Sequence, residues 1–227
     1  MKMTSKLIAA AMLAGTFSVA QAAPMDVFDL KTDSGADVFT DTLGEGSFYD
    51  NGASFAKLND VDGTQDSAGA FLLFEFAGFA NINNFGIYNL NDPSETLQVF
   101  SGIEGSGGRE VAFDLDAGTA STYYGTANIG STFGFYLQRG DTTFYSDASL
   151  NGGVDMTRIF DVTGSQNGSF FGSSLIVAFE DLLDGDFDYN DLIVGISDVQ
   201  AVPEPGTLAL FGLGLLGLGM TRGRKSA

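Results

Sequence analysis

The sequence predicts an all-β fold, an antiparallel β-sandwich of jelly-roll type, flanked by an N-terminal signal helix and a C-terminal transmembrane helix. Between the two ends, short runs rich in Phe, Val and Ile alternate with clusters of Gly, Asn, Asp and Ser about every ten residues. This spacing is typical of short strands joined by tight turns. No interior stretch has the apolar period of an amphipathic helix.

The N-terminal segment, residues 1–22, has the layout of a secretory signal peptide. Lys2 and Lys6 form a basic start, residues 7–19 are apolar, and Ala20-Gln21-Ala22 supplies the small-x-small pattern at which signal peptidase cuts. The apolar run is shorter than the roughly 20 residues that a membrane-spanning helix needs. We therefore expect signal peptidase to remove residues 1–22 during export.

Residues 23–201 are expected to form one β-sandwich domain. Within 132–138, the large apolar residues Phe133, Phe135 and Leu137 alternate with others, which indicates a strand with one buried face. The ten predicted strands are 54–58, 71–76, 85–89, 97–101, 110–114, 132–138, 142–146, 156–162, 175–179 and 192–197. Ten strands suit two packed sheets.

The charge of this domain excludes nucleic acid as a partner. Five of the 10 Lys and Arg residues lie in the terminal segments, as does one of the 29 Asp and Glu residues, so the domain carries 5 − 28 = −23. Such a charge repels phosphates and anionic lipid, and it attracts cations and basic partners. Membrane contact is expected only through the C-terminal anchor.

The absence of two residue types from the sequence narrows the possible chemistry. The chain has no Cys and no His, so disulfides, thiol chemistry, imidazole bases and the usual zinc or copper sites are excluded. We expect a protein that is not an enzyme.

The most informative interior segment is the Asp-rich stretch at 178–194. Asp184, Asp186, Asp188 and Asn190 recur at every second position, so in a loop their oxygen atoms can converge on a hard cation, with calcium as the candidate. The predicted metal ligands are Glu180, Asp181, Asp184, Asp186, Asp188, Asn190 and Asp191. A solvated turn, in which Asn and Asp cap backbone groups, is the alternative.

This stretch is not an EF-hand. Counted from Asp184, the sixth position is Tyr189 where Gly is required, and the twelfth is Gly195 where Glu is required. Any calcium site here must be of another type.

Two tripeptides, Phe179-Glu180-Asp181 and Tyr189-Asn190-Asp191, resemble the signature of a domain of unknown function found in exported bacterial proteins. The aromatic runs at 133–137 and 144–146 extend this resemblance over about residues 131–199, the Asp-rich-signature module. Arg158 departs from it, because similar proteins often have His at that position.

The C-terminal segment, residues 202–227, combines a motif, an apolar run and a basic end. Pro203-Glu204-Pro205 is followed by apolar residues 207–220 and then by Arg222, Arg224 and Lys225. We expect that Pro203 and Pro205 cannot continue a strand and that the basic end stays in the cytoplasm, so a peptidase can reach the motif. This order resembles the PEP-CTERM sorting tail, which implies processing by an exosortase, whereas a simple membrane anchor is the alternative.

Taken together, these features predict an exported structural protein of the cell envelope, outer surface or extracellular matrix. Its acidic surface and calcium site would support adhesion or biofilm assembly, with extracellular polysaccharide as a candidate partner. The runner-up is a calcium-dependent carbohydrate-binding module in which exposed Tyr123, Tyr124 and Tyr136 stack on sugars. A glycosidase ranks third, because the chain has no Trp to line a sugar cleft.

Overall fold

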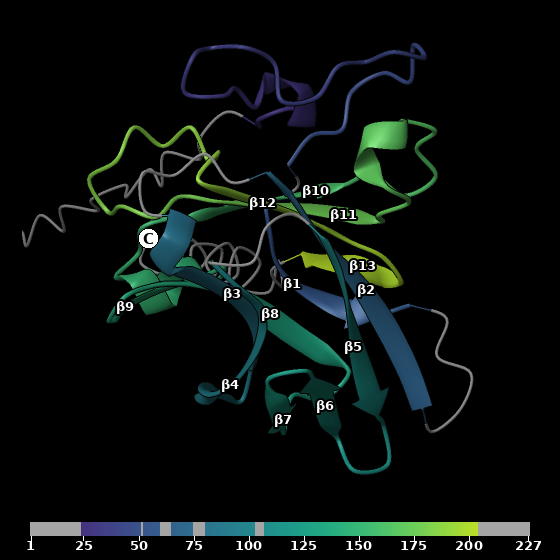
Figure 1. The fold of residues 1–227 in the computed structure, drawn as a ribbon, viewed down its shortest axis with the longest axis vertical. Coiled ribbons are helices and arrows are strands. Elements are labelled where there is room, and N and C mark those ends of the chain that lie inside the picture. The colour runs from purple at the N-terminus through teal and green to yellow at the C-terminus, as the bar shows by residue number, and fades with distance from the viewer. Residues whose placement is uncertain (1–23, 51, 60–64, 75–79, 103–106, 204–227) are drawn as a thin grey trace, which may run out of the picture.

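The computed structural model describes residues 24–50, 52–59, 65–74, 80–102 and 107–203, and these form two antiparallel sheets packed face to face (Figure 1). The predicted all-β sandwich is therefore confirmed. The predicted signal and transmembrane helices lie outside the described residues, as do Glu204 and Pro205. Within the described part of the chain, helices are short turns, and none could cross a membrane.

The first sheet has six strands in the order β13-β1-β8-β3-β4, with β9 also paired to β8. Their bounds are β1 Ala53–Leu58, β3 Asn83–Asn89, β4 Asp92–Ser101, β8 Thr132–Arg139, β9 Thr142–Tyr145 and β13 Val199–Pro203. Strands β8 and β9 form a hairpin whose turn contains Gly140 at φ 56°. Glycine suits that left-handed conformation because it has no Cβ.

The second sheet has seven strands in the order β10-β11-β12-β2-β5-β6-β7. Their bounds are β2 Gln65–Phe74, β5 Gly107–Asp114, β6 Thr119–Thr122, β7 Gly125–Ala127, β10 Thr157–Asp161, β11 Leu175–Phe179 and β12 Leu192–Ile196. Four 3₁₀ turns complete the described elements, η1 Val27–Asp29, η2 Ala80–Ile82, η3 Ala148–Asn151 and η4 Gly168–Phe170. Strands β10, β11 and β12 form a meander at one edge of the sheet.

All ten predicted strands overlap an observed strand, and three observed strands were not predicted. β6 and β7 are short segments of Thr, Ser, Ala and Gly that lack an apolar run. β13 pairs with β1 and places Pro203 opposite Ala53, so the expectation that Pro203 lies outside any strand is wrong. β13 is an edge strand, where a proline is tolerated because one side needs no partner.

The main core lies between the two sheets and is rich in phenylalanine. Phe133 of β8 stacks on Phe113 of β5 at 5.4 Å between ring centroids. Phe85 of β3 meets Phe179 of β11 edge to face at 6.2 Å. These ring pairs join the two sheets, and each contributes beyond its buried area.

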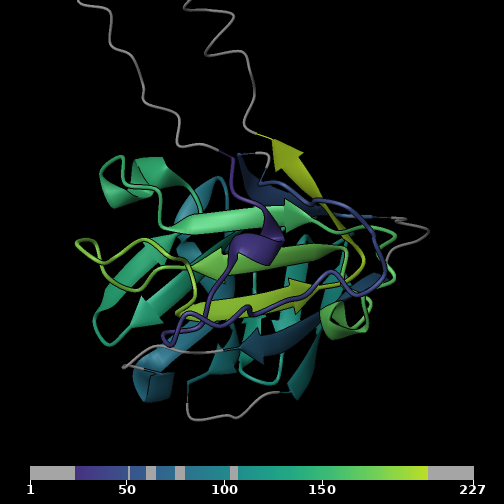
Figure 2. The same cartoon turned by 90° about the horizontal axis from the view of Figure 1, so that it is seen from above.

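A second core covers the outer face of the β10-β11-β12 meander. It forms where the N-terminal segment, residues 24–50, crosses those strands (Figure 2). Val27, Leu30 and Phe39 of that segment are buried there against Phe160 and Phe170. Hydrogen bonds between Val27 and Phe48 and between Asp50 and Met25 close the segment on itself.

Strands β11 and β12 are consequently buried on both faces. Leu175, Val177 and Phe179 belong to the main core, whereas Ile176 and Ala178 belong to the second. This division follows the two-residue period of a strand. The unbroken apolar sequence of these strands therefore reflects two cores rather than one.

Glycine and tyrosine pair twice across strands β3 and β8. Tyr88 is opposite Gly134 and Tyr136 is opposite Gly86, and a Cβ on either glycine would overlap the facing ring. Tyr136 is consequently buried, with 5% of its surface exposed, so the expectation that it is available to stack on sugars is wrong.

Substitution Gly134→Ala is expected to lower the free energy of unfolding by about 1–3 kcal/mol, because the added methyl group must displace the Tyr88 ring. Urea denaturation measures the loss. Gly168→Ala is the matched control, since a Cβ there meets open space, and its effect should stay within about 0.5 kcal/mol. Equal losses in both variants would contradict this packing argument.

Candidate functional site

The Asp-rich loop, residues 180–191, joins the end of β11 to the start of β12. Phe179 and Leu192 are paired in the ladder, so the loop leaves and re-enters the sheet at the same edge. Because these two strands are held by two cores, both ends of the loop are fixed. The loop thus projects from a rigid base, which favours a defined arrangement of its side chains.

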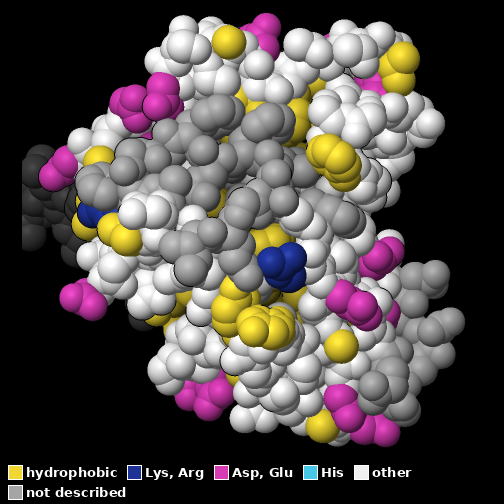
Figure 3. All heavy atoms as spheres, viewed as in Figure 1, with side chains coloured by type: hydrophobic (Ala, Val, Ile, Leu, Met, Phe, Trp, Pro, Cys, Tyr) yellow, Lys and Arg dark blue, Asp and Glu magenta, His cyan; other side chains and the backbone are white. Residues whose placement is uncertain are grey.

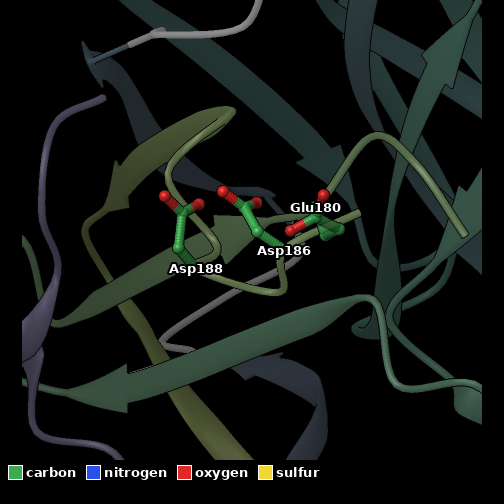
Figure 4. A group of neighbouring side chains, drawn as sticks. All are labelled: Glu180, Asp186 and Asp188. Carbon is green, nitrogen blue, oxygen red and sulfur yellow. The ribbon is translucent and has the colours of Figure 1, made fainter. Parts of the chain in front are cut away.

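Three carboxylates of this loop converge. One oxygen from each of Glu180, Asp186 and Asp188 lies within 4.8 Å of the others. Figure 4 shows the three side chains next to one another, with Asp186 between the other two. We refer to these three residues as the acidic cluster. Carboxylates this close repel one another strongly unless a proton or a cation intervenes.

Glu180 is the most constrained member of the acidic cluster. Only 2% of its surface is exposed, and its Oε2 atom has no hydrogen-bond partner. The loop closes on this side chain at Gly185, where a Cβ would collide with the carboxylate. A buried carboxylate oxygen without a partner costs several kcal/mol, so a bound cation would relieve a specific penalty here.

Burial raises the pKa of Glu180 to about 8, and the negative charges of Asp191 and Asp186 add to the rise. Burial also raises the pKa of Asp191, whose carboxylate lies beside that of Glu180. The same cause raises the pKa of Asp188. Without a cation, Glu180 therefore holds a proton at neutral pH.

Two other predicted ligands serve the protein itself. Asp181 is buried, accepts a hydrogen bond from Asn83 Nδ2 at 3.0 Å, and pairs with Arg139 at 3.5 Å. Asn190 donates from Nδ2 to the carbonyl of Lys31 at 2.7 Å and to Asp188 at 2.5 Å. Asp181 thus anchors the start of the loop, and Asn190 ties its end to the N-terminal segment.

The last two predicted ligands differ in position. Asp191 accepts a hydrogen bond from the Asp181 amide at 2.8 Å, which closes the base of the loop beside Glu180. Asp184 is exposed and lies outside the acidic cluster. The regular spacing therefore brings Asp186 and Asp188 together, whereas Asp184 lies apart from them.

The backbone of the loop is strained at two aromatic residues. Phe187 and Tyr189 both have φ 57°, a left-handed conformation that bulky side chains rarely adopt. Tyr189 is held there because its ring is buried in the second core and its hydroxyl donates to the Asp155 carbonyl at 3.1 Å. Such strain persists only where surrounding contacts enforce it, and it is common at functional sites.

Arg158 of β10 supports the same loop from beneath. Its guanidinium lies 4.5 Å from the centroid of the Tyr189 ring and pairs with Asp50 at 3.3 Å and with Asp155. Arg158 therefore links the loop, the end of the N-terminal segment and β10. A planar cation suits this position because it can stack on a ring and bind carboxylates at once.

Several residues at the site carried no recognisable signal in the sequence. A cavity of about 450 Å³ lies beside the acidic cluster, and one of its walls is the N-terminal turn at residues 31–35. That wall is far from the loop in the sequence, so no local pattern could have revealed it. Gly185, by contrast, lies between two Asp residues within the Asp-rich stretch, and this pattern could have predicted a tight turn there.

Without metal, the stability of the protein is expected to fall as the pH rises from about 5 to 8. The pKa of Glu180 is raised from 4.5 to about 8 in the folded state. Below pH 4.5 both states hold the proton and the folded state incurs no penalty. Between pH 4.5 and about 8 the unfolded chain has released the proton, so folding must take it up again and stability falls. Urea denaturation in EDTA across this range measures the fall. Glu180→Gln should flatten the profile, and identical profiles for the two proteins would contradict the assignment.

Comparison with known proteins identifies two parts of the chain. Residues 107–198 match the family model for a domain of unknown function, DUF4114, and residues 201–225 match the PEP-CTERM protein-sorting motif. No curated protein and no solved structure matches the chain. The chain therefore combines a segment that matches the DUF4114 model with a PEP-CTERM sorting motif, and the motif implies an exported protein that an exosortase processes.

Proposed function

We propose that this chain is a non-enzymatic structural protein of the cell surface or extracellular matrix, and that its Asp-rich loop binds a calcium ion. The observation that supports the calcium site best is the Glu180 carboxylate, buried and with an unpaired oxygen beside Asp186 and Asp188. A proton can neutralise this carboxylate only below about pH 8. A divalent cation neutralises the whole cluster.

Calcium fits this site better than other common metals. All the candidate ligands are oxygen atoms, which hard cations prefer, and the chain has no Cys or His for zinc or copper. Magnesium demands near-ideal octahedral geometry, whereas calcium accepts an irregular set of six to eight oxygens. The acidic cluster provides three carboxylates, and water or loop carbonyls can complete the coordination.

Calcium binding here would stabilise the folded protein only after export. Extracellular modules commonly bind calcium with dissociation constants of about 10⁻⁴–10⁻³ M, so such a site fills outside the cell and empties in the cytoplasm. A formal net charge of −19 on the whole chain opposes compaction, and bound calcium reduces that repulsion. The exosortase-processed protein would then be a rigid acidic component of the matrix, suited to adhesion and to cation-bridged contact with polysaccharide.

A calcium-dependent carbohydrate-binding module is the second candidate. Tyr123 has 88% of its surface exposed and meets Tyr124 edge to face at 5.4 Å, so this pair offers a ring to a sugar. Co-sedimentation with extracellular polysaccharide, comparing wild type with Tyr123→Ala, tests this candidate. Loss of binding in the variant would support it, and equal binding would remove it.

The geometry is less suited to a glycosidase. Such enzymes place one acid on each side of a sugar, with carboxyl groups about 5–9.5 Å apart. Here three carboxylates crowd within 4.8 Å, and Glu180, the group with the raised pKa, does not line the adjacent cavity. Such crowding favours a shared cation over a sugar placed between two acids.

Millimolar calcium is expected to raise the melting temperature of the wild-type chain by about 5–10 °C over the EDTA-treated form, because a ligand that binds only the folded state stabilises it by mass action. The effect should saturate. The double variant Asp186→Asn, Asp188→Asn should lose it, since two of the three clustered carboxylates are gone. Thermal unfolding in mild detergent, which keeps the C-terminal apolar run soluble, measures both.

Asp184→Asn is the matched control for that experiment. It removes a charge from the same loop but lies outside the acidic cluster, so it should keep most of the calcium response. If all three proteins respond alike, the loop is only a solvated turn and the calcium proposal fails.

A further inference from the structure

The N-terminal turn, residues 31–35, forms the second wall of the cavity beside the acidic cluster. Residues from two parts of the chain that are distant in sequence line this cavity of about 450 Å³: Lys31, Thr32, Asp33 and Gly35, and Asp186, Asp188, Asn190 and Asp191. Asp186 and Asp188 belong both to this lining and to the acidic cluster. A cation bound by the cluster would therefore border the turn.

The turn has a defined conformation. The Gly35 amide donates to the Thr32 carbonyl at 2.7 Å, and the Ala36 amide donates to the Thr32 hydroxyl at 3.1 Å. Gly35 has φ 80°, which glycine adopts without strain. These bonds present Asp33 near the tip of the turn, where among the described residues no hydrogen bond or ion pair engages its carboxylate.

Two observations place Asp33 near the acidic cluster. Asn190 donates a hydrogen bond to the Lys31 carbonyl at 2.7 Å, which fixes the turn against the end of the loop. Asp33 also lines the same cavity as Asp186 and Asp188. Without a cation, the negative charges of Asp33, Asp186 and Asp188 therefore border one cavity and repel one another.

The N-terminal segment is thus held well at its centre but poorly at the cavity. Apolar contacts in the second core hold its centre, through Val27, Leu30 and Phe39. Its rim at the cavity instead sets Asp33 near Asp186 and Asp188, while the Lys31 ammonium pairs with Asp37. A divalent cation would convert this repulsion into shared coordination, because calcium accepts more oxygens than the cluster supplies.

We propose that Asp33 is a further ligand of the cation, directly or through a bound water, so that calcium clips the N-terminal segment to the Asp-rich loop. This inference rests on the calcium site proposed above. It adds a ligand from outside the residues that match the DUF4114 model, 107–198. The matched residues alone would then hold an incomplete site, and cation binding and docking of the segment would strengthen each other.

Isothermal titration of the EDTA-stripped full chain with calcium tests this proposal. Asp33→Asn should weaken binding about tenfold, because calcium affinity follows the number of charged ligands. Asp116→Asn is the matched control. It removes another exposed acid, from the β5–β6 turn at the end of the sandwich opposite the N-terminal segment (Figure 1), and should leave the dissociation constant within about twofold.

Hydrogen exchange provides the second measurement. Calcium should slow exchange of amides in residues 30–38 of the wild type, and it should do so much less in Asp33→Asn. If the wild type binds no calcium, the proposed calcium site fails and this inference fails with it. If the wild type binds calcium while Asp33→Asn binds equally well and residues 30–38 are equally protected, only the role of Asp33 is overturned.

Discussion

The burial of strands β11 and β12 on both faces is the constraint on which the candidate site depends. The main core holds Val177 and Phe179 from one side, and the second core holds Ile176 and Ala178 from the other. A strand enclosed in this way cannot slip, because a one-residue shift would exchange two well-packed sets of side chains. The Asp-rich loop is therefore closed across two fixed points, and its strained residues can be maintained.

The same arrangement explains how so many acids can be concentrated in one loop. Asp181 is neutralised by Arg139 and by a hydrogen bond from Asn83, and Arg158 balances Asp50 and Asp155 beneath Tyr189. Arg139 and Arg158, two cations near the loop, are thus already paired with Asp181, Asp50 and Asp155. This pairing leaves the acidic cluster uncompensated, and an uncompensated buried carboxylate such as Glu180 needs either a proton or a cation. Figure 3 shows acidic side chains in several separate patches on the face of Figure 1, where Lys and Arg side chains are sparse.

The unfavourable electrostatics of the Asp-rich loop lie next to strands that are buried on both faces. Two aromatic residues with positive φ and the buried Glu180 carboxylate are features that cluster at functional sites. The second core holds Tyr189 in this conformation. The N-terminal segment consequently has two roles, covering the apolar outer face of the meander and forming one wall of the cavity.

The sequence by itself determined the fold class, the ten main strands and the position of the Asp-rich loop, because each depends on local periodicity or on a local run of turn-forming residues. It also determined the sorting tail, since that signal is read along the chain. Only the tertiary structure decided which acids meet. It separated Asp181 and Asp184 from Glu180, Asp186 and Asp188, and it brought the turn at 31–35 beside them, because such choices depend on where each backbone turns and on contacts between distant segments. The second core and the edge strand β13 escaped prediction for the same reason, as each is defined by a partner far away in the sequence.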